Sequence, residues 1–422
     1  MRVVIINKSD STGGAAVVSY RLMLSLRESG VDASMLVTEK LTDSPYVHLL
    51  CKPSVIKRAF LRERLGIFMH NGLNRADLFK VDTASAGVPV VTHPLVREAD
   101  VVVLGWVNQG LMSIDEVRRV ATLKPTVWVL HDMWCATGIC HHAGECRGFT
   151  AECGNCPLLH SMKGRKDISA LTYARKQRLY ADVSITFVPV SNWLASRCAD
   201  STLLRNADVR VIPNPFPLPE HRFSARYNPE HLNLLMVAAR IDDPIKGLDT
   251  LCGALSVLKD RDPRLHSRIH LTLLGNIKDH AALLPLSVPY DAYGSVPVSM
   301  IEPFYRQADI LVSPSSYETL PGTLVEAQAY GALPVAFDSG GQRDIVTPGE
   351  TGILVRRDTD PDKNVAAFAQ GIADAAALLE TGSRRALARA MYAEVESKFG
   401  CRNVAQRYID LFSELIKSRA AN

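Results

Sequence analysis

Short apolar runs alternate with helical patterns along most of the chain. The run Val3–Ile6 is followed by Ser11-Thr-Gly-Gly14, and then by a segment from Ala15 to about Arg27 with apolar residues on one helical face. Further apolar runs follow at 101–104, 126–130 and 185–188. Because strands that alternate with helices in this way form parallel sheets covered by helices, we expect the first half to be a Rossmann-like domain.

A proline-rich segment interrupts this pattern halfway along the chain. Residues 213–219 hold four prolines in seven positions, and proline fits neither a helix interior nor a central strand, so we place an interdomain linker there. The alternation then restarts, with apolar runs at 233–239, 269–274, 310–312 and 333–337. A second Rossmann-like domain is therefore expected, followed by a helical pattern from about 365 to 418.

Composition narrows the classes of function. The 422 residues suffice for two or three domains, and 48 Lys and Arg against 44 Asp and Glu leave a net charge of only +4. Such a balance does not predict a nucleic-acid binder, which needs concentrated positive charge. No apolar stretch approaches the roughly 18 residues of a transmembrane helix, and the N-terminal run is too short for a signal peptide. We therefore expect a cytoplasmic protein in a reducing compartment.

Two places in the sequence suit a phosphate group, although neither half has the Gly-x-Gly-x-x-Gly turn of a dehydrogenase. Gly13 and Gly14 precede a helix, where backbone N–H groups attract anions, but a glycine pair there is more often only a turn. In the second half, Arg240 ends a strand and Lys246 precedes the helix that begins at Gly247. These cations suit a diphosphate, whose charge grows as it leaves, unless they merely pair with neighbouring aspartates.

Two glutamates, Glu318 and Glu326, flank the start of a helix in the second half. Glu318 falls in the loop after the run at 310–312, and Glu326 lies about one turn into the helix. Their carboxylates could accept hydrogen bonds from the hydroxyls of a sugar and a ribose, beside the free N–H groups of the helix start. These N–H groups belong to Gly322, Thr323 and Leu324. The alternative is that one glutamate only caps the helix and the other lies on its solvent-exposed face.

Together these motifs resemble the retaining glycosyltransferases of the GT-B fold, family 4. In order along the chain they are Gly13-Gly14, His131-Asp132, Arg240, Lys246-Gly247, Glu318 and Glu326. The resemblance implies an α/β protein of two Rossmann-like domains that face a cleft. Residues 1–212 would bind the acceptor, 213–219 would be the linker, 220–400 would bind the nucleotide sugar, and 401–422 would pack back on the first domain.

The resemblance also implies roles for these residues. Arg240 and Lys246 would hold the diphosphate of a UDP- or GDP-sugar, and Glu326 would bind its ribose. Glu318 would contact the transferred sugar, and His131 would line the reaction centre. The phosphates would also be approached by the glycines Gly13 and Gly14 and by the helix-start amides of Gly322, Thr323 and Leu324.

The implied mechanism is front-face attack, in which the departing phosphate oxygen helps to deprotonate the acceptor hydroxyl. It needs neither an enzymatic nucleophile nor a catalytic metal ion, because Arg240 and Lys246 supply the positive charge. Two departures from the family pattern concern this phosphate clamp. Ala239 stands where the family has glycine, and the spacing from arginine to lysine is one residue longer.

A cysteine-rich segment at 135–157 resembles an insertion in bacterial exopolysaccharide transferases similar to the colanic-acid enzymes. Its spacing is Cys-x5-Cys-x6-Cys-x2-Cys, formed by Cys140, Cys146, Cys153 and Cys156. Four thiolates suit a structural, tetrahedral zinc ion, with His141 and His142 as substitute ligands. Free thiols or disulfides are the alternatives.

Residues 53–70 predict a basic amphipathic helix. Its apolar stripe comprises Val55, Ile56, Ala59 and Phe60, and the cations near it are Lys52, Lys57, Arg58, Arg62 and Arg64. Such a helix can lie on an anionic membrane surface, where a lipid-linked acceptor would be met. It can equally be a surface helix that packs on its own domain.

The expected function is transfer of a sugar from a nucleotide donor to a hydroxyl of a glycan or lipid-linked oligosaccharide in bacterial polysaccharide biosynthesis. The enzyme would work in the cytoplasm or at the inner face of the membrane. Two other hypotheses stay open. One is a sugar-nucleotide epimerase built on the same fold, and the other is a non-catalytic sugar-nucleotide or zinc-dependent scaffold.

Overall fold

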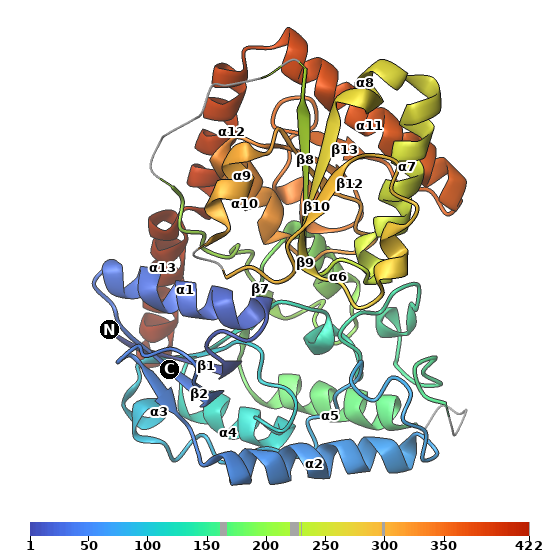
Figure 1. The fold of residues 1–422 in the computed structure, drawn as a ribbon. Helices are drawn as coiled ribbons and strands as arrows, with labels where there is room; N and C mark the ends of the chain where they lie inside the picture. The colour runs from blue at the N-terminus through green and yellow to red at the C-terminus, as the bar shows by residue number, and fades with distance from the viewer. Residues whose placement is uncertain (161–166, 220–227, 229, 298–299, 422) are drawn as a thin grey trace. The chain divides into compact units, whose positions relative to one another are not determined.

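The computed structural model describes residues 1–160, 167–219, 228, 230–297 and 300–421. The chain divides into two compact units. The first comprises Met1–Pro215 together with the C-terminal helix from Cys401 onward, and the second comprises Phe216–Gly400. Each unit is built on its own parallel sheet (Figure 1).

The sheet of the first unit has seven strands in the order β3-β2-β1-β4-β5-β6-β7, and every neighbouring pair is parallel. The strands are β1 (Arg2–Ser9), β2 (Asp32–Glu39), β3 (Val47–Leu49), β4 (Val101–Leu104), β5 (Thr126–Leu130), β6 (Thr186–Pro189) and β7 (Asp208–Val209). All residues of the central strands β4, β5 and β6 are buried, which explains their uninterrupted apolar sequences.

Several helices of the first unit begin at a capping side chain. They are α1 (Gly14–Glu28), α2 (Pro53–His70), α3 (Pro94–Glu98), α4 (Ile114–Leu123), α5 (Ile168–Asp182), α6 (Asn192–Asp200) and α13 (Cys401–Ala421). Ser113, Asp167 and Ser191 each accept a hydrogen bond from a backbone N–H in the first turn of α4, α5 and α6. The region between β5 and α5 contains only short 3₁₀ turns among its described residues, at Trp134–Ala136 and Gly148–Thr150.

The sheet of the second unit has six strands in the order β10-β9-β8-β11-β12-β13, again parallel throughout. Its strands are β8 (Leu232–Arg240), β9 (Ile269–Asn276), β10 (Tyr290–Ala292), β11 (Ile310–Ser313), β12 (Leu333–Phe337) and β13 (Ile353–Val355). Its helices are α7 (Leu248–Arg261), α8 (Pro263–Arg268), α9 (Glu302–Gln307), α10 (Gly322–Tyr330), α11 (Pro361–Thr381) and α12 (Arg384–Phe399). The carboxyl ends of β8 and β11, which are neighbours, meet at one edge of this sheet.

The last helix, α13, belongs to the first unit although it follows the second in sequence. It packs along α1, and Arg419 donates hydrogen bonds of 2.8 Å to the carbonyl oxygens of Thr122 and Leu123 at the end of α4. The proline-rich segment straddles the unit boundary, since Phe216 is buried against Phe399 of the second unit.

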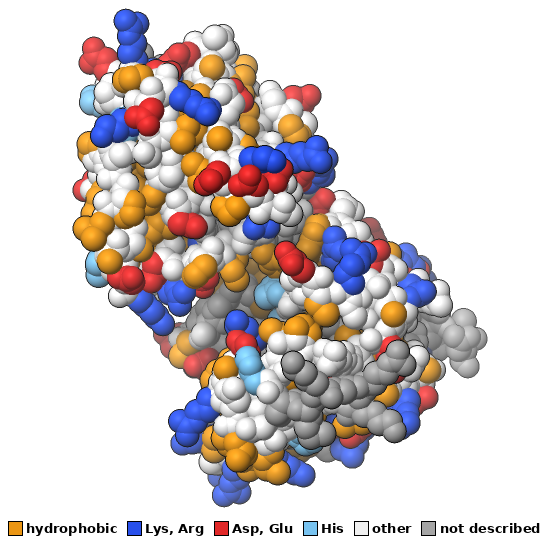
Figure 2. Space-filling view, turned by 90° about the vertical axis from the view of Figure 1, so that its right-hand side faces the viewer, with side chains coloured by type: hydrophobic (Ala, Val, Ile, Leu, Met, Phe, Trp, Pro, Cys, Tyr) orange, Lys and Arg blue, Asp and Glu red, His pale blue; other side chains and the backbone are white. Residues whose placement is uncertain are grey.

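On the face shown in Figure 2, acidic and basic side chains are interspersed, as the net charge of +4 leads one to expect. No helix among the described residues is both long enough and apolar enough to cross a membrane.

Candidate functional site

The central feature of the second unit is a contact between Lys246 and Glu318. The Lys246 ammonium lies 2.6 Å from Glu318 Oε1, and both side chains are largely withdrawn from solvent, at 29% and 19% exposure. The turn after β8 provides Lys246, and the loop after β11 provides Glu318. The two loops are also joined by their backbones, because the Ser316 N–H donates to the Ile245 carbonyl oxygen at 2.8 Å. Lys246 therefore pairs with Glu318 and not with the neighbouring aspartates.

Gly247 fixes the position of Lys246. It adopts φ +74°, and a Cβ atom added there would lie 2.2 Å from the carbonyl oxygen of Pro314. Only glycine accepts both the left-handed conformation and this close approach. On the other loop, the Gly341 N–H donates to the Glu318 carbonyl oxygen at 2.9 Å, which holds the backbone of Glu318 in place.

Arg240, at the end of β8, has a different environment from Lys246. Its guanidinium lies 3.5 Å from carboxylate oxygens of Asp242 and of Asp243. For Arg240, the alternative of pairing with neighbouring aspartates is therefore the one that the structure shows. Arg240 Nε and Asp242 Oδ1 are buried, and neither makes a hydrogen bond within the described residues.

The helix start between the two glutamates is only partly available to a ligand. The N-cap residue of α10, Pro321, makes no side-chain hydrogen bond to the first turn. The Leu324 N–H, however, donates to the Pro321 carbonyl oxygen at 3.1 Å. The prediction that the Leu324 amide is free is therefore wrong, because the helix already uses it. Gly322 and Thr323 remain as the candidate amides.

Glu326 is half-buried in α10 and accepts a hydrogen bond of 2.9 Å from the Tyr305 hydroxyl. Tyr305 is fully buried and stacks on Tyr330. The alternative of a capping and a solvated glutamate therefore holds for neither residue, since Glu318 pairs with Lys246 and Glu326 with Tyr305. Tyr305 was not predicted, because a lone tyrosine in a short helix gives no sequence signal.

In the first unit, the candidate phosphate loop is open. Gly13, with φ +87°, and Gly14 are exposed, and a Cβ atom added at either would meet no atom within 4 Å. Helix α1 has neither an acidic residue in its first turn nor a side-chain cap. The N–H groups at its start therefore keep the positive end of the helix dipole uncompensated.

His131 and Asp132 follow the end of β5. Burial lowers the pKa of His131 to about 4, so the imidazole is neutral at physiological pH. Its Nε2 atom is buried without a hydrogen-bond partner among the described residues. Asp132, in contrast, accepts hydrogen bonds from Trp106 Nε1 at 3.2 Å and from the Trp134 N–H at 2.8 Å.

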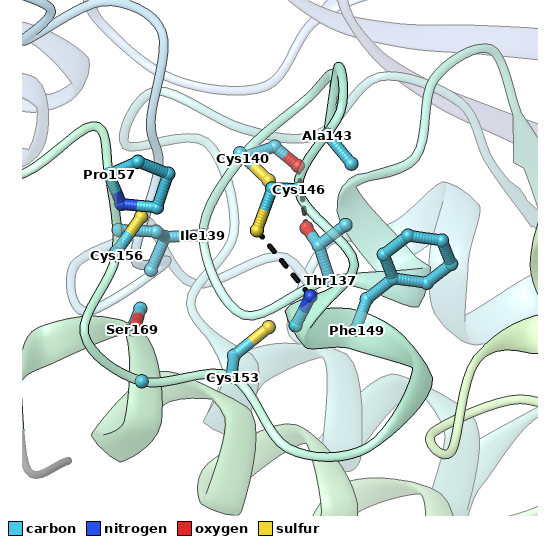
Figure 3. A pocket seen from close by; sticks show the side chains of 12 residues that line it. Thr137, Ile139, Cys140, Ala143, Cys146, Phe149, Cys153, Cys156, Pro157 and Ser169 are labelled. Carbon is cyan, nitrogen blue, oxygen red and sulfur yellow. Dashed lines mark hydrogen bonds between the residues drawn. The ribbon is translucent and has the colours of Figure 1, made fainter.

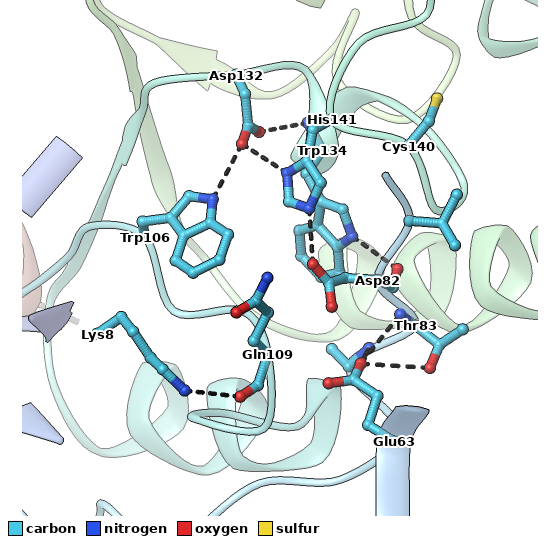
Figure 4. A network of polar contacts seen from close by, with 12 residues as sticks. Lys8, Glu63, Asp82, Thr83, Trp106, Gln109, Asp132, Trp134, Cys140 and His141 are labelled. Atoms are coloured by element: carbon cyan, nitrogen blue, oxygen red, sulfur yellow. Dashed lines mark hydrogen bonds and ion pairs between the residues drawn. The ribbon is translucent and has the colours of Figure 1, made fainter. Parts of the chain in front are cut away.

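His141 connects this strand end to the rest of the unit (Figure 4). Its Nδ1 lies 2.6 Å from Asp132 Oδ2, and its Nε2 lies 2.7 Å from Asp82 Oδ2. Burial alone would lower the pKa of His141, but the two carboxylates raise it to about 10. Arg64 makes a further ion pair with Asp82. Because both ring nitrogens face carboxylates, His141 is not a substitute zinc ligand.

Helix α2 packs differently from the prediction. Its buried residues are Ala59, Glu63, Arg64 and Ile67. Arg64 is thus part of the interior network and not of a basic surface, and Val55 is 40% exposed. Of the predicted stripe only Val55 is exposed, since Ile56 packs half-buried against the hydrophobic core and Phe60 is half-buried. Glu63 and Arg64 were not predicted to share this inner face.

The four clustered cysteines line one small pocket (Figure 3). All nine cysteines of the chain are free thiols, so the disulfide alternative is not what the structure shows. The Gly138 N–H donates to Cys153 Sγ at 3.2 Å, and the Gly148 N–H donates to Cys146 Sγ at 3.5 Å. Among the residues that the structure describes, no three Cys, His, Asp or Glu side chains converge closely enough to hold a metal ion.

A protein-family model matches most of the second unit. Residues 220–390 match the family model of glycosyl transferases group 1. The chain is 30% identical over 213 residues to a D-inositol 3-phosphate glycosyltransferase from Streptomyces griseus subsp. griseus, which covers 47% of the chain and 43% of that protein. The same enzyme from Streptomyces scabiei is 31% identical over 177 residues, with 39% and 38% covered. The chain thus matches less than half the length of these curated relatives.

Solved structures resemble the chain over nearly its whole length. Anabaena Alr3699/HepE in complex with UDP and glucose gives a TM-score of 0.60 at 14% identity, covering 98% of this chain and 100% of that one. WaaG, a glycosyltransferase involved in lipopolysaccharide biosynthesis, gives 0.59 at 14% identity, covering 97% and 99%. The pneumococcal O-GlcNAc transferase GtfA in complex with UDP and GlcNAc gives 0.62 at 13% identity, covering 99% of both chains.

The chain has the GT-B fold. The two parallel sheets and these structural neighbours confirm the fold class predicted from the sequence.

Proposed function

We propose that this protein is a retaining glycosyltransferase that moves a sugar from a nucleoside diphosphate to a hydroxyl of a glycan or lipid-linked acceptor. The group 1 match over residues 220–390 supports sugar transfer. Neighbours of the same fold whose structures contain UDP support a nucleotide-sugar donor. UDP-sugars are therefore the first donors to test, and GDP-sugars the second.

One observation carries this proposal, the contact between Lys246 and Glu318 beside the start of α10. The topology brings these residues, 72 positions apart in sequence, within 2.6 Å. Lys246, with Arg240, is proposed to hold the donor diphosphate and to stabilise the charge that develops as it leaves. Glu318 is proposed to accept hydrogen bonds from the transferred sugar, and Glu326 from the ribose.

The proposed mechanism uses positioning and charge. An oxygen of the departing phosphate takes the proton of the acceptor hydroxyl as that hydroxyl attacks the same face of the sugar, so the protein supplies no nucleophile. With its pKa lowered to about 4 by burial, His131 would be neutral at physiological pH, and we propose that it donates or accepts a hydrogen bond at the sugar. Because Arg240 and Lys246 would supply the positive charge at the diphosphate, catalysis is proposed to be independent of a divalent metal.

The test begins with binding. In the wild type we expect UDP or GDP to raise the unfolding temperature, and Glu326→Ala to weaken that nucleotide's affinity about tenfold, equivalent to about 1.4 kcal/mol. Lys246→Ala is expected to lower turnover more than affinity. The exposed residues Lys259 and Glu350 of the same unit provide the matched controls Lys259→Ala and Glu350→Ala.

Product analysis separates the hypotheses. A transferase releases the nucleoside diphosphate and gives a glycoside, whereas an epimerase returns an isomeric nucleotide sugar. Kinetics that are the same in Lys246→Ala, Glu326→Ala and both controls would contradict the proposed site. Binding of nucleotide sugar without either product, across UDP- and GDP-sugars and glycan acceptors, would favour a non-catalytic scaffold.

We further propose that the acceptor is met at an anionic membrane surface, with α2 as the contact. The outer face of α2 carries Leu61, Leu65 and Met69, one turn apart and 53%, 57% and 60% exposed. Lys57, Arg58 and Arg62 are exposed on the same helix. Apolar side chains flanked by cations suit lipids with negative headgroups.

Vesicle co-sedimentation tests this contact. The wild type should bind vesicles of phosphatidylglycerol and phosphatidylcholine but not of phosphatidylcholine alone, and Leu61→Ser/Leu65→Ser should lose binding. Leu171→Ser, at a residue of α5 that is 55% exposed, is the matched control. Equal sedimentation of the wild type with both vesicle types would contradict a charge-dependent contact.

A further inference from the structure

We propose that Cys140, Cys146, Cys153 and Cys156 bind a structural zinc ion, which fixes the segment between β5 and α5. The described part of this segment before α5, residues 131–160, contains only two short 3₁₀ turns and an isolated bridge at Cys140 as regular structure. A stretch of this length without regular structure is uncommon inside a compact domain, and small structures without a core of their own are commonly stabilised by a metal.

The four thiols already surround one space. All of them line the same pocket, and Figure 3 shows the side chains of Cys140, Cys146 and Cys153 turned toward it. Asn155, between the last two cysteines, has φ +49°, and the chain bends there. Two cysteine sulfurs also accept backbone N–H groups, and a thiolate is a stronger acceptor for such bonds than a thiol.

A buried lysine supplies an independent observation. The side chain of Lys176, in α5, is fully buried, and its ammonium donates to the carbonyl oxygens of Trp134 at 2.5 Å and Thr137 at 3.0 Å. It also lies 3.3 Å from the centre of the Trp134 ring. No ion pair recorded for the described residues includes it. The ionisable groups that act on its charge are the thiols of Cys135, Cys140 and Cys153 and, more weakly, the Asp132 carboxylate.

Charge balance connects this lysine to the cysteines. A buried ammonium without a carboxylate partner is costly, and four neutral thiols do nothing to offset that cost. Four thiolates around one Zn²⁺ carry a net charge of −2, which would stabilise the Lys176 ammonium. The lysine in turn would favour the thiolates over the thiols. Binding would release the four thiol protons to solvent.

The geometry requires a local adjustment. Zinc–sulfur bonds of about 2.3 Å demand that the sulfurs meet at one point, and in this structure no three ligand side chains do so among the described residues. Each sulfur is one rotatable bond from the backbone, so rotation of the cysteine side chains about the pocket can bring them together. The ion would then anchor the chain beside His141, whose ring holds Asp82 and Asp132.

The experiment measures metal directly. Full-length protein without a histidine tag, purified under reducing conditions, should contain close to one zinc ion per chain by mass spectrometry. Cys153→Ser/Cys156→Ser should contain close to none. Cys51→Ser, at another partly buried thiol of the first unit, is the matched control and should keep the zinc of the wild type.

A cobalt titration of the wild type tests the same site without the double variant, which could fail to fold. Wild-type protein stripped of metal and titrated with Co²⁺ should show the strong visible absorption of a tetrahedral thiolate site, and should release protons as it does so. Zinc-free wild type that unfolds cooperatively and takes up neither Zn²⁺ nor Co²⁺ would overturn the proposal. Neither result depends on the proposed transferase activity.

Discussion

Substitution of Gly247 tests the construction of the Lys246 site. In Gly247→Ala, the new Cβ would be placed 2.2 Å from the Pro314 carbonyl oxygen, in a residue with φ +74°. The left-handed conformation costs an L-residue roughly 1–2 kcal/mol. The clash is with backbone, so the turn after β8 and the exit of β11 must separate, and overpacking of this kind costs roughly 1–3 kcal/mol more.

Gly349→Ala separates these two effects. Gly349 has φ +79°, but a Cβ atom there would meet nothing within 4 Å. Its substitution therefore carries only the conformational cost, part of which the stiffer unfolded chain offsets, leaving about 1 kcal/mol. Gly247→Ala should cost about 3 kcal/mol. For a domain of this size these costs correspond to decreases in unfolding temperature of roughly 3 °C and 10 °C.

Differential scanning calorimetry and nucleotide binding check this prediction together. Gly247→Ala should lower the unfolding temperature more than Gly349→Ala does, and it should weaken UDP or GDP binding because Lys246 moves with the turn. Gly349→Ala should bind nucleotide as the wild type does. Equal decreases in unfolding temperature for the two variants would refute the argument from the Pro314 contact.

Three further predictions concern the first unit. Burial lowers the pKa of His131 to about 4 from an ordinary 6.5. Between these pH values the unfolded state therefore binds more protons than the folded state. The contribution of His131 to the free energy of unfolding should fall by at most about 3 kcal/mol as the pH drops from 6.5 to 4. His131→Asn should lose that dependence, so a stability difference from the wild type that is the same at pH 7 and pH 4.5 would contradict it. Gly14→Ala should leave the unfolding temperature within roughly 2 °C but lower turnover, and unchanged kcat/KM with a nucleotide sugar would exclude the phosphate role. His141→Gln should cost about 3 kcal/mol in urea unfolding, because it removes the cation between two buried carboxylates, of which only Asp82 keeps another cation, Arg64. His142→Gln, at an exposed neighbour, should have little effect.

The apolar runs predicted most of the strands that are buried on both faces, but not β2 (Asp32–Glu39), which lies inside the sheet between β3 and β1. The run at 101–104 is β4, and the run at 126–130 is β5, each buried at every position. Strand β10 (Tyr290–Ala292) was not predicted, because its three residues are exposed at the sheet edge and carry no hydrophobic pattern. Strand β7 (Asp208–Val209) is too short to give any periodicity.

The sequence indicated which residue types belong in a phosphate and sugar site, but not their contacts. Lys246 and Glu318 meet because β8 and β11 are neighbours in the sheet, and strand order is not encoded in either motif. Asp82 gave no signal at all, since it lies outside regular structure and acquires its role only through His141 and Arg64. Such long-range polar contacts depend on how separate loops are brought together.

The pairing of Lys246 with Glu318 also explains why these residues should have unequal roles in binding and turnover. Without a donor, the charge of Lys246 is balanced by Glu318 at 2.6 Å, so the half-buried pair has no uncompensated charge. A diphosphate that binds Lys246 must compete with this carboxylate, and the net gain in affinity is therefore small. As the sugar–phosphate bond breaks, negative charge grows on the phosphate, and the attraction to Lys246 increases at that moment. An interaction that strengthens toward the transition state appears in turnover rather than in affinity, whereas a hydrogen bond between Glu326 and the ribose would be made equally in the ground state and the transition state and so would appear in affinity.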